Sequence, residues 1–284
     1  MNRPTRVILL SGLSGAGKSV ALRALEDLGF YCIDNLPAPL LPQAVGLLEA
    51  DGYGKLAISV DARSAHNFAS FPEHLAALVE LGLDVQVLFL DAQDTALVRR
   101  YSESRRAHPL SQGKLTVAEC VAMEREMLAL VRESAQVIDT TGLSANQLRG
   151  WLRDWVAVDG QQMTLVFQSF GFKRGLPSDA DFVFDARCLP NPFYDPVLRP
   201  LTGKDQPVAD FLEAEPNVGV FISQARGMLK QWLPEFERDQ RGSLTVAIGC
   251  TGGQHRSVYC VEQLAALFAG EYPVLIRHRE QAHL

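Results

Sequence analysis

Long apolar runs, paired cysteines and an excess of basic charge are all missing from this sequence of 284 residues. No apolar run reaches the roughly 18 residues that a membrane-spanning helix needs, which excludes a membrane span. The five cysteines are odd in number and form no CxxC pair, so we expect neither a disulfide framework nor a zinc site, and a cytoplasmic location fits best. The net charge of -6 gives no sign of a broad nucleic-acid-binding surface, although a local basic patch is compatible with it.

What is present is the composition of a folded domain, with 47% hydrophobic and 21% charged residues. In the first half, short apolar runs alternate with longer helical patterns, which predicts an α/β fold with a parallel sheet. The expected strands are 6–10, 30–34, 55–61, 85–91 and 135–139. The expected helices are 18–28, 39–49, 65–81, 94–102, 116–132 and 144–155, with capping boxes at Thr116 and Ser144.

A polar stretch at 157–162 is the best linker candidate, and the pattern restarts after it. We therefore expect a first domain over residues 1–158 and a second α/β domain over 159–284. In the second domain the expected strands are 163–170, 181–185, 244–249 and 273–276, and the expected helices are 208–212, 218–232 and 257–268. The prolines of 188–203 predict an irregular segment.

The clearest motif is a phosphate-binding loop of the G-x-x-x-x-G-K-S type near the N-terminus. Its residues are Gly12, Leu13, Ser14, Gly15, Ala16, Gly17, Lys18 and Ser19. The loop stands between an apolar run and a helical pattern, where backbone N–H groups and the helix N-terminus converge on phosphates. We expect a nucleoside triphosphate here, with Lys18 on the β- and γ-phosphates and Ser19 on Mg²⁺. The alternative is a glycine-rich turn that carries Lys-Ser by chance.

Acidic side chains end three of the expected strands, at Asp34, Asp61 and Asp91. Ligands of open α/β sheets bind at this edge, and Asp91 is the best candidate for a Walker-B carboxylate that holds Mg²⁺. A helix N-cap or a loop carboxylate is the alternative for each.

Two arginine pairs follow the strand that ends at Asp91, namely Arg99-Arg100 and Arg105-Arg106. Arginine makes bidentate bonds to phosphate, so these residues could clamp a triphosphate. A solvated helix face is the alternative. The sequence has no N-K-x-D motif, so the preferred base stays open.

A second glycine-rich turn joins an apolar strand to a helix near the C-terminus. Its residues are Cys250, Thr251, Gly252, Gly253, Gln254, His255, Arg256 and Ser257. We expect it to bind the phosphate of a small metabolite, with a bidentate contact from Arg256 and a charge on His255 that grows toward pH 6. The C-x5-R-S spacing also occurs in cysteine-dependent phosphatases, so catalysis by Cys250 and a purely structural turn remain alternatives.

Four blocks together carry a family resemblance: GLSGAGKSVALRALEDLGFYCIDNLP, VRRYSESRRAHPL, LVFQSFGFKRGLPSDADFVFDARCLPNPFYDPVLRPLTG and AIGCTGGQHRSVYCVEQLA. With these blocks the chain resembles the RapZ/YvcJ family of bacterial nucleotide-binding proteins, also called RNase adapter proteins. The resemblance implies a kinase-like first domain that binds and slowly hydrolyses ATP and GTP. It assigns ATP to the loop 12–19 and GTP to Asp61, Ala62, Arg63 and Ser64.

For the second domain the resemblance implies sensing of an amino-sugar phosphate, oligomerisation, and presentation of small RNA to an endoribonuclease. RNA-binding members end in a basic tail, whereas this chain ends in VLIRHREQAHL. The RNA-contact candidates are Lys173, Arg174, Arg277 and Arg279. A regulatory adapter is thus the first hypothesis, and a small-molecule kinase and a phosphatase that uses Cys250 are the alternatives.

Overall fold

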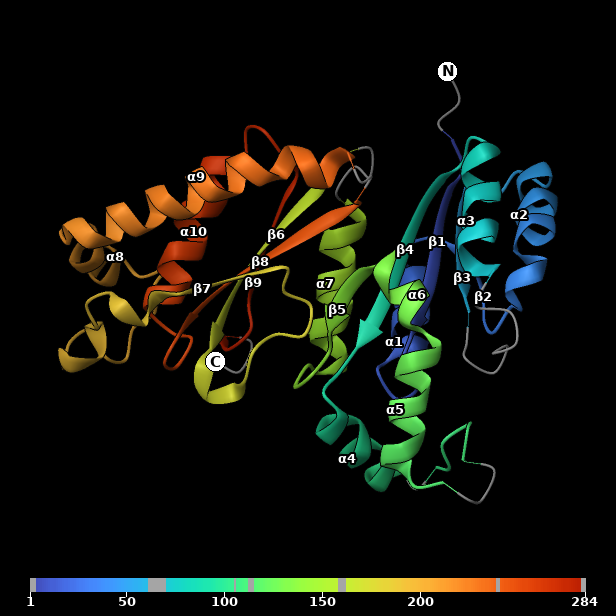
Figure 1. Cartoon of the computed structure of the whole chain (residues 1–284), viewed down its shortest axis with the longest axis horizontal. Coiled ribbons are helices and arrows are strands. Elements are labelled where there is room, and N and C mark those ends of the chain that lie inside the picture. Colours follow the sequence, from blue (N-terminus) through green and yellow to red (C-terminus); the bar gives the residue numbers. More distant parts are fainter. Residues whose placement is uncertain are drawn as a thin grey trace. The chain divides into compact units, whose positions relative to one another are not determined.

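Strands alternate with helices along the chain, as Figure 1 shows for this computed structural model. The structure describes residues 4–60, 70–104, 106–111, 115–157, 162–238 and 241–281. The chain divides into two compact units, Met1–Ala157 and Val158–Leu284. All strand pairs among the described residues are parallel, which confirms the expected α/β class.

The first unit has a five-stranded sheet in the order β2-β3-β1-β4-β5. Its strands are β1 (Arg6–Gly12), β2 (Tyr31–Ile33), β3 (Lys55–Ser59), β4 (Asp84–Asp91) and β5 (Gln136–Asp139). The helices are α1 (Lys18–Asp27), α2 (Leu41–Ala50), α3 (Phe71–Glu80), α4 (Asp94–Ser104), α5 (Val117–Met127), α6 (Ala129–Glu133) and α7 (Ala145–Ala157), and a 3-10 turn, η1 (Ala38–Leu40), precedes α2. The central strand β1 is buried from its second residue onward, as expected for a parallel strand covered on both faces.

The register of the central strands fixes where the phosphate loop begins. Gly12, the last residue of β1, stands opposite Leu90 of β4. A Cβ at Gly12 would lie 2.3 Å from the carbonyl oxygen of Leu90, and φ is 141°, so only glycine fits this close approach. The loop therefore leaves the sheet beside the end of β4, where Asp91 stands.

Both expected capping boxes are present. Thr116 and Glu119 bond each other's backbone N–H groups at the start of α5, and Ser144 and Gln147 do the same before α7. The single helix expected over 116–132 is divided at Leu128 into α5 and α6. The sequence does not mark this break, because neither glycine nor proline stands there.

The second unit has a four-stranded sheet in the order β7-β8-β6-β9. The strands are β6 (Thr164–Gly171), β7 (Phe182–Asp185), β8 (Ser243–Cys250) and β9 (Val274–His278), and the helices are α8 (Gln206–Glu213), α9 (Pro216–Arg238) and α10 (Arg256–Phe268). The proline-rich segment includes a 3-10 turn, η5 (Pro192–Tyr194), because proline is compatible with the first position of a helical turn.

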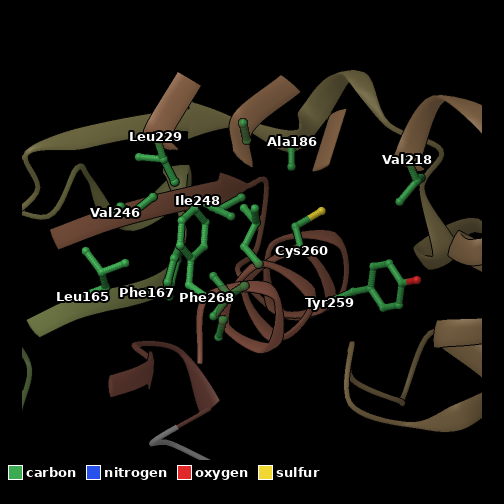
Figure 2. Close-up of a cluster of buried hydrophobic side chains, with 14 of the residues drawn as sticks. Leu165, Phe167, Ala186, Val218, Leu229, Val246, Ile248, Tyr259, Cys260 and Phe268 are labelled. Carbon is green, nitrogen blue, oxygen red and sulfur yellow. The ribbon is translucent and has the colours of Figure 1, made fainter. Parts of the chain in front are cut away.

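The core of this unit joins its sheet to α9 and α10, as Figure 2 shows. Phe167 of β6 and Phe268 of α10 are fully buried, with ring centroids 5.7 Å apart. The same cluster contains Leu229 of α9 and Ile248 of β8.

Among the described residues, no helix combines the length and the apolar character needed to cross a membrane.

Candidate functional site

The phosphate loop of the first unit is built by glycines in left-handed conformations. Gly15 has φ 87° and Gly17 has φ 109°, a region that other residues rarely adopt. Gly17 is the N-cap of α1 and offers no side chain, so the first N–H groups of the helix face outward from its end. The ammonium group of Lys18 donates to the carbonyl oxygen of Gly12 at 2.5 Å and thus lies folded against the loop. This arrangement presents N–H groups and a cation to an anion.

A pocket of about 690 Å³ opens over this loop. Its walls come from the loop, from the turn after β2, from α4 and from the segment that follows α4. The lining residues are Ser14, Gly15, Gly17, Lys18, Ser19, Val20, Asp34, Asn35, Arg100, Tyr101, Ser104, Arg106, Ala107 and Pro109. Leu13 and Ala16 of the predicted motif also belong to the loop, but their side chains are buried and do not line the pocket. The pocket has the cations and amides that a polyphosphate needs.

The two members of the first arginine pair have different surroundings, because neighbouring residues of a helix point about 100° apart. Arg100 lines the pocket and braces the loop, since its guanidinium donates to the carbonyl oxygens of Gly15 at 3.0 Å and Thr140 at 2.6 Å. Arg99 is exposed and lies 3.7 Å from Glu103. The structure therefore contradicts Arg99 as part of the clamp.

From the second pair, Arg106 lines the pocket. Arg105 lies outside the described residues, as do Asp61, Ala62, Arg63 and Ser64 of the expected GTP segment. The assignments of these five residues stay predictions.

Asp91 is placed differently from the expected metal ligand. Its buried carboxylate accepts two bonds from Arg125, at 2.9 and 3.0 Å, and one from Arg132 at 3.2 Å. It is not among the residues that line the pocket, whereas Asp34 is. The structure thus corrects the sequence-based choice, because two guanidinium groups neutralise Asp91 while the exposed Asp34 borders the pocket.

Sequence reasoning missed a buried cluster behind the loop. Glu124 of α5 is fully buried and accepts bonds from both the N–H and the hydroxyl of Ser14, at 2.8 and 2.7 Å. His108, which is also buried, has its Nε2 3.3 Å from Glu124. The signal in the sequence was an acidic residue on the apolar side of an amphipathic helix, in line with Cys120 and Leu128.

In the second unit, the turn from Cys250 to Ser257 connects β8 to α10. The sulfur of Cys250 accepts the N–H of Gly253 at 3.2 Å and lies 3.1 Å from the hydroxyl of Ser257. Gly253 has φ 75°, and a Cβ there would meet Glu280 and Gly171. Thr251 and Gly252 are exposed at the tip of the turn.

Three side chains of this turn point away from it, toward the segment 187–201. Gln254 donates to the carbonyl oxygen of Leu201 at 2.8 Å, and Nε2 of His255 lies 3.2 Å from that of Leu198. Arg256 donates through Nη1 to the carbonyl oxygens of Arg187 and Leu189, at 2.9 and 3.0 Å. These side chains hold the proline-rich segment in place.

The structure bears on two expectations about this turn. Burial lowers the pKa of His255, so the ring gains its charge at a lower pH than an exposed histidine does. Nη1 of Arg256 is engaged by main-chain carbonyl oxygens and Nη2 lies 3.4 Å from the hydroxyl of Thr251, so this guanidinium supports the fold, and its bidentate contact with a phosphate stays a prediction. An anion at the tip would meet backbone N–H groups and the start of α10.

Two of the four RNA-contact candidates are buried. Arg277 is 9% exposed and lies 3.3 Å from Asp179, and Arg279 is 8% exposed and donates to the carbonyl oxygen of Gly175 at 2.7 Å. The prediction that these two arginines contact RNA is wrong, because they are structural groups of β9 and its neighbours. Lys173 and Arg174 are exposed, and Arg174 pairs with Glu280 at 2.8 Å.

Comparison with known proteins covers both units. The profile of the RapZ-like N-terminal domain matches residues 5–160, and that of the RapZ C-terminal domain matches residues 163–282. A "Nucleotide-binding protein" from Chromobacterium violaceum is 55% identical over 275 residues, which span 97% of this chain and 98% of that protein. A nucleotide-binding protein from Bordetella petrii is 52% identical over 282 residues, 97% of each chain.

Among solved structures, a shikimate kinase from Acinetobacter baumannii in complex with shikimate overlaps 53% of this chain and 92% of its own, with a TM-score of 0.39 and 18% identity. The two domain profiles cover nearly the whole sequence in the order in which the two units occur. They also bear out the resemblance that the four sequence blocks carried. This chain therefore belongs to the RapZ family.

Proposed function

We propose that this protein is a regulatory nucleotide-binding protein, which binds ATP and GTP in the first unit and hydrolyses them slowly. The proposal rests on one observation: the phosphate loop, Arg100 and Arg106 line the same pocket. Arginine, lysine and backbone N–H groups are the donors that bind polyphosphates in proteins. The relatives from Chromobacterium violaceum and Bordetella petrii are named nucleotide-binding proteins, which supports the same assignment.

The described residues fit a Mg²⁺-nucleotide. Ser19 stands in the first turn of α1 and lines the pocket, so its hydroxyl would hold the ion together with phosphate oxygens of the nucleotide. Lys18 would leave the carbonyl oxygen of Gly12 and turn to the β- and γ-phosphates. The bound ion would supply charge neutralisation at the γ-phosphate.

The test is the substitution Lys18→Ala, compared with Arg23→Ala, which removes an exposed cation from the same helix. We expect Lys18→Ala to abolish ATP and GTP hydrolysis and to weaken binding, because the charge on the phosphates is lost. Arg23→Ala should behave as the wild type in titration calorimetry and in a phosphate-release assay. Unchanged binding and hydrolysis in folded Lys18→Ala would contradict the nucleotide site. A regulatory role also requires wild-type turnover below the roughly 1 per second of kinases.

For the second unit we propose that the turn Cys250–Ser257 binds a phosphorylated amino sugar without cleaving it. The exposed tip at Thr251 and Gly252 and the N-terminus of α10 support this proposal. The contacts of Arg256 with main-chain carbonyls argue for a fixed turn rather than for a catalytic arginine.

The test titrates glucosamine phosphate into the wild type and into Thr251→Val, which removes the exposed hydroxyl. We expect binding in the wild type and about 3- to 10-fold weaker binding in Thr251→Val, as for the loss of one hydrogen bond. Cys250→Ser should still bind, since a hydroxyl can accept the N–H of Gly253. Release of phosphate that depends on Cys250 would instead indicate a phosphatase.

The adapter role for small RNA and an endoribonuclease completes the proposal, as the family resemblance implies. Lys173 and Arg174 are the exposed cations of the original four candidates. Replacing both by alanine should weaken RNA binding and lower its salt dependence, because phosphate contacts release counterions. RNA binding that is unchanged in this double variant would place the contact elsewhere.

A further inference from the structure

Glu124 does not line the nucleotide pocket, but it contacts two parts of the chain that form its lining. On one side its carboxylate holds Ser14 of the phosphate loop. On the other side it faces His108, which lies between the pocket-lining residues Ala107 and Pro109. The side chains of Glu124 and His108 are both 0% exposed, so this contact lies wholly inside the protein.

The bond to Ser14 fixes both the backbone and the side chain of that residue. One carboxylate oxygen accepts the N–H at 2.8 Å, and the other accepts the hydroxyl at 2.7 Å. The N–H of Ser14 is therefore directed at Glu124, and the amides that remain for phosphate are those that follow it in the loop. Two buried hydrogen bonds to one carboxyl group are directional, because each fixes one polar atom of Ser14.

The contact with His108 is a close approach of two buried groups. The N–H of Leu110 donates to Nδ1 of His108 at 3.2 Å, and Nε2 lies 3.3 Å from the carboxylate of Glu124 without the geometry of a hydrogen bond. The ring also packs against Tyr101, with centroids 5.1 Å apart. A Cβ at Gly15 would lie 3.3 Å from Tyr101, so α4 lies directly against the phosphate loop.

The helix that carries Glu124 is itself fastened at the sheet edge. The next residue, Arg125, bonds Asp91 at the end of β4 and donates to Asp94 at 2.8 Å. Arg125 of α5 thus bonds the end of β4, and its neighbour Glu124 bonds the phosphate loop.

We propose that Glu124 is a positioning residue of the nucleotide site, which sets the phosphate loop through Ser14 and packs against His108 of the segment that follows α4. This inference rests on the proposed nucleotide binding. It assigns to Glu124 no contact with the nucleotide, and it predicts that the residue acts on affinity through the shape of the loop.

The experiment measures the dissociation constant for Mg-ATP well below the melting temperature, in the full chain. Glu124→Ala should bind about 10- to 100-fold more weakly, the loss expected when two buried hydrogen bonds that shape the loop are removed. Glu124→Gln should bind within about threefold of the wild type. Its amide oxygen can accept from Ser14 N–H and His108, and its amide nitrogen can donate to a rotated Ser14 hydroxyl. Glu126→Ala, an exposed glutamate of the same helix, should bind as the wild type.

A purely structural role would lower the melting temperature of Glu124→Ala and leave its affinity for Mg-ATP unchanged, and that result would overturn the inference. Equal losses in Glu124→Gln and Glu124→Ala would also contradict it. If Glu124→Ala fails to fold, Glu124→Asp decides: its carboxylate is one methylene shorter and cannot reach both Ser14 and His108, so wild-type affinity would refute the role. Absence of Mg-ATP binding by the wild type would refute the proposed function itself.

Discussion

Single residues of the phosphate loop are placed by groups that do not belong to the motif. Arg100 donates to the carbonyl oxygens of Gly15 and Thr140, and Glu124 accepts from Ser14. These bonds fix main-chain groups at two positions of the loop. The loop is thus held by one side chain from α4 and one from α5.

This geometry separates the two members of the first arginine pair. Arg100→Ala should weaken Mg-ATP binding by roughly 10-fold or more, because a half-buried guanidinium that braces the loop is lost. Arg99→Ala should stay within about twofold, since an exposed pair such as Arg99–Glu103 contributes little. Calorimetric titration of the two variants side by side measures the difference. Equal losses would restore Arg99 to the clamp.

At the scale of elements, helix α5 depends on the box that begins it. Thr116 accepts the N–H of Glu119, and the carboxylate of Glu119 accepts the N–H and hydroxyl of Thr116. Because α5 carries Glu124 and Arg125, the start of this helix bears on the nucleotide site.

Thr116→Ala should lower the melting temperature by roughly 2–4 °C near pH 7, the usual effect of losing an N-cap in a chain of this size. The bonds from Thr116 lower the pKa of Glu119, so their stabilisation is present above the ordinary carboxyl pKa and is lost as pH falls through the folded-state value. The difference between wild type and variant should therefore shrink in acid. Thermal melts across pH 3–7 measure this, and a difference that grows in acid would contradict it.

At the scale of the whole molecule, each unit has its own parallel sheet and its own buried core. All residues that line the nucleotide pocket belong to Met1–Ala157. The turn Cys250–Ser257 and its partners belong to the second unit.

Residues 1–157 produced alone should therefore fold and bind Mg-ATP within about threefold of the full chain, since the site and its supports are complete within them. Cooperative thermal unfolding and calorimetric titration provide the measurement. A folded fragment that no longer binds Mg-ATP would show that the site needs residues of the second unit.

The sequence by itself determined the class of fold and the positions of most elements, because the periods of apolar residues and the glycine turns are local properties. It also located the two glycine-rich turns before α1 and α10, since such turns depend on residues that are neighbours in the chain. Only the tertiary structure decided which charged side chains line the pocket and which are buried in the fold. The sequence alone predicted functional roles for Arg277, Arg279 and Asp91. In the structure each of them is buried against a partner that is distant in the sequence.

The physical reason is that burial and pairing depend on what packs against a residue from elsewhere in the chain. Ser14 and Glu124 are 110 positions apart, and no local pattern links them. Arg99 and Arg100 are neighbours on α4 and point in different directions. Which of the two faces the pocket follows from the placement of α4 beside the loop. The sequence therefore defines the loops that can bind phosphate, and the tertiary contacts determine how those loops are held.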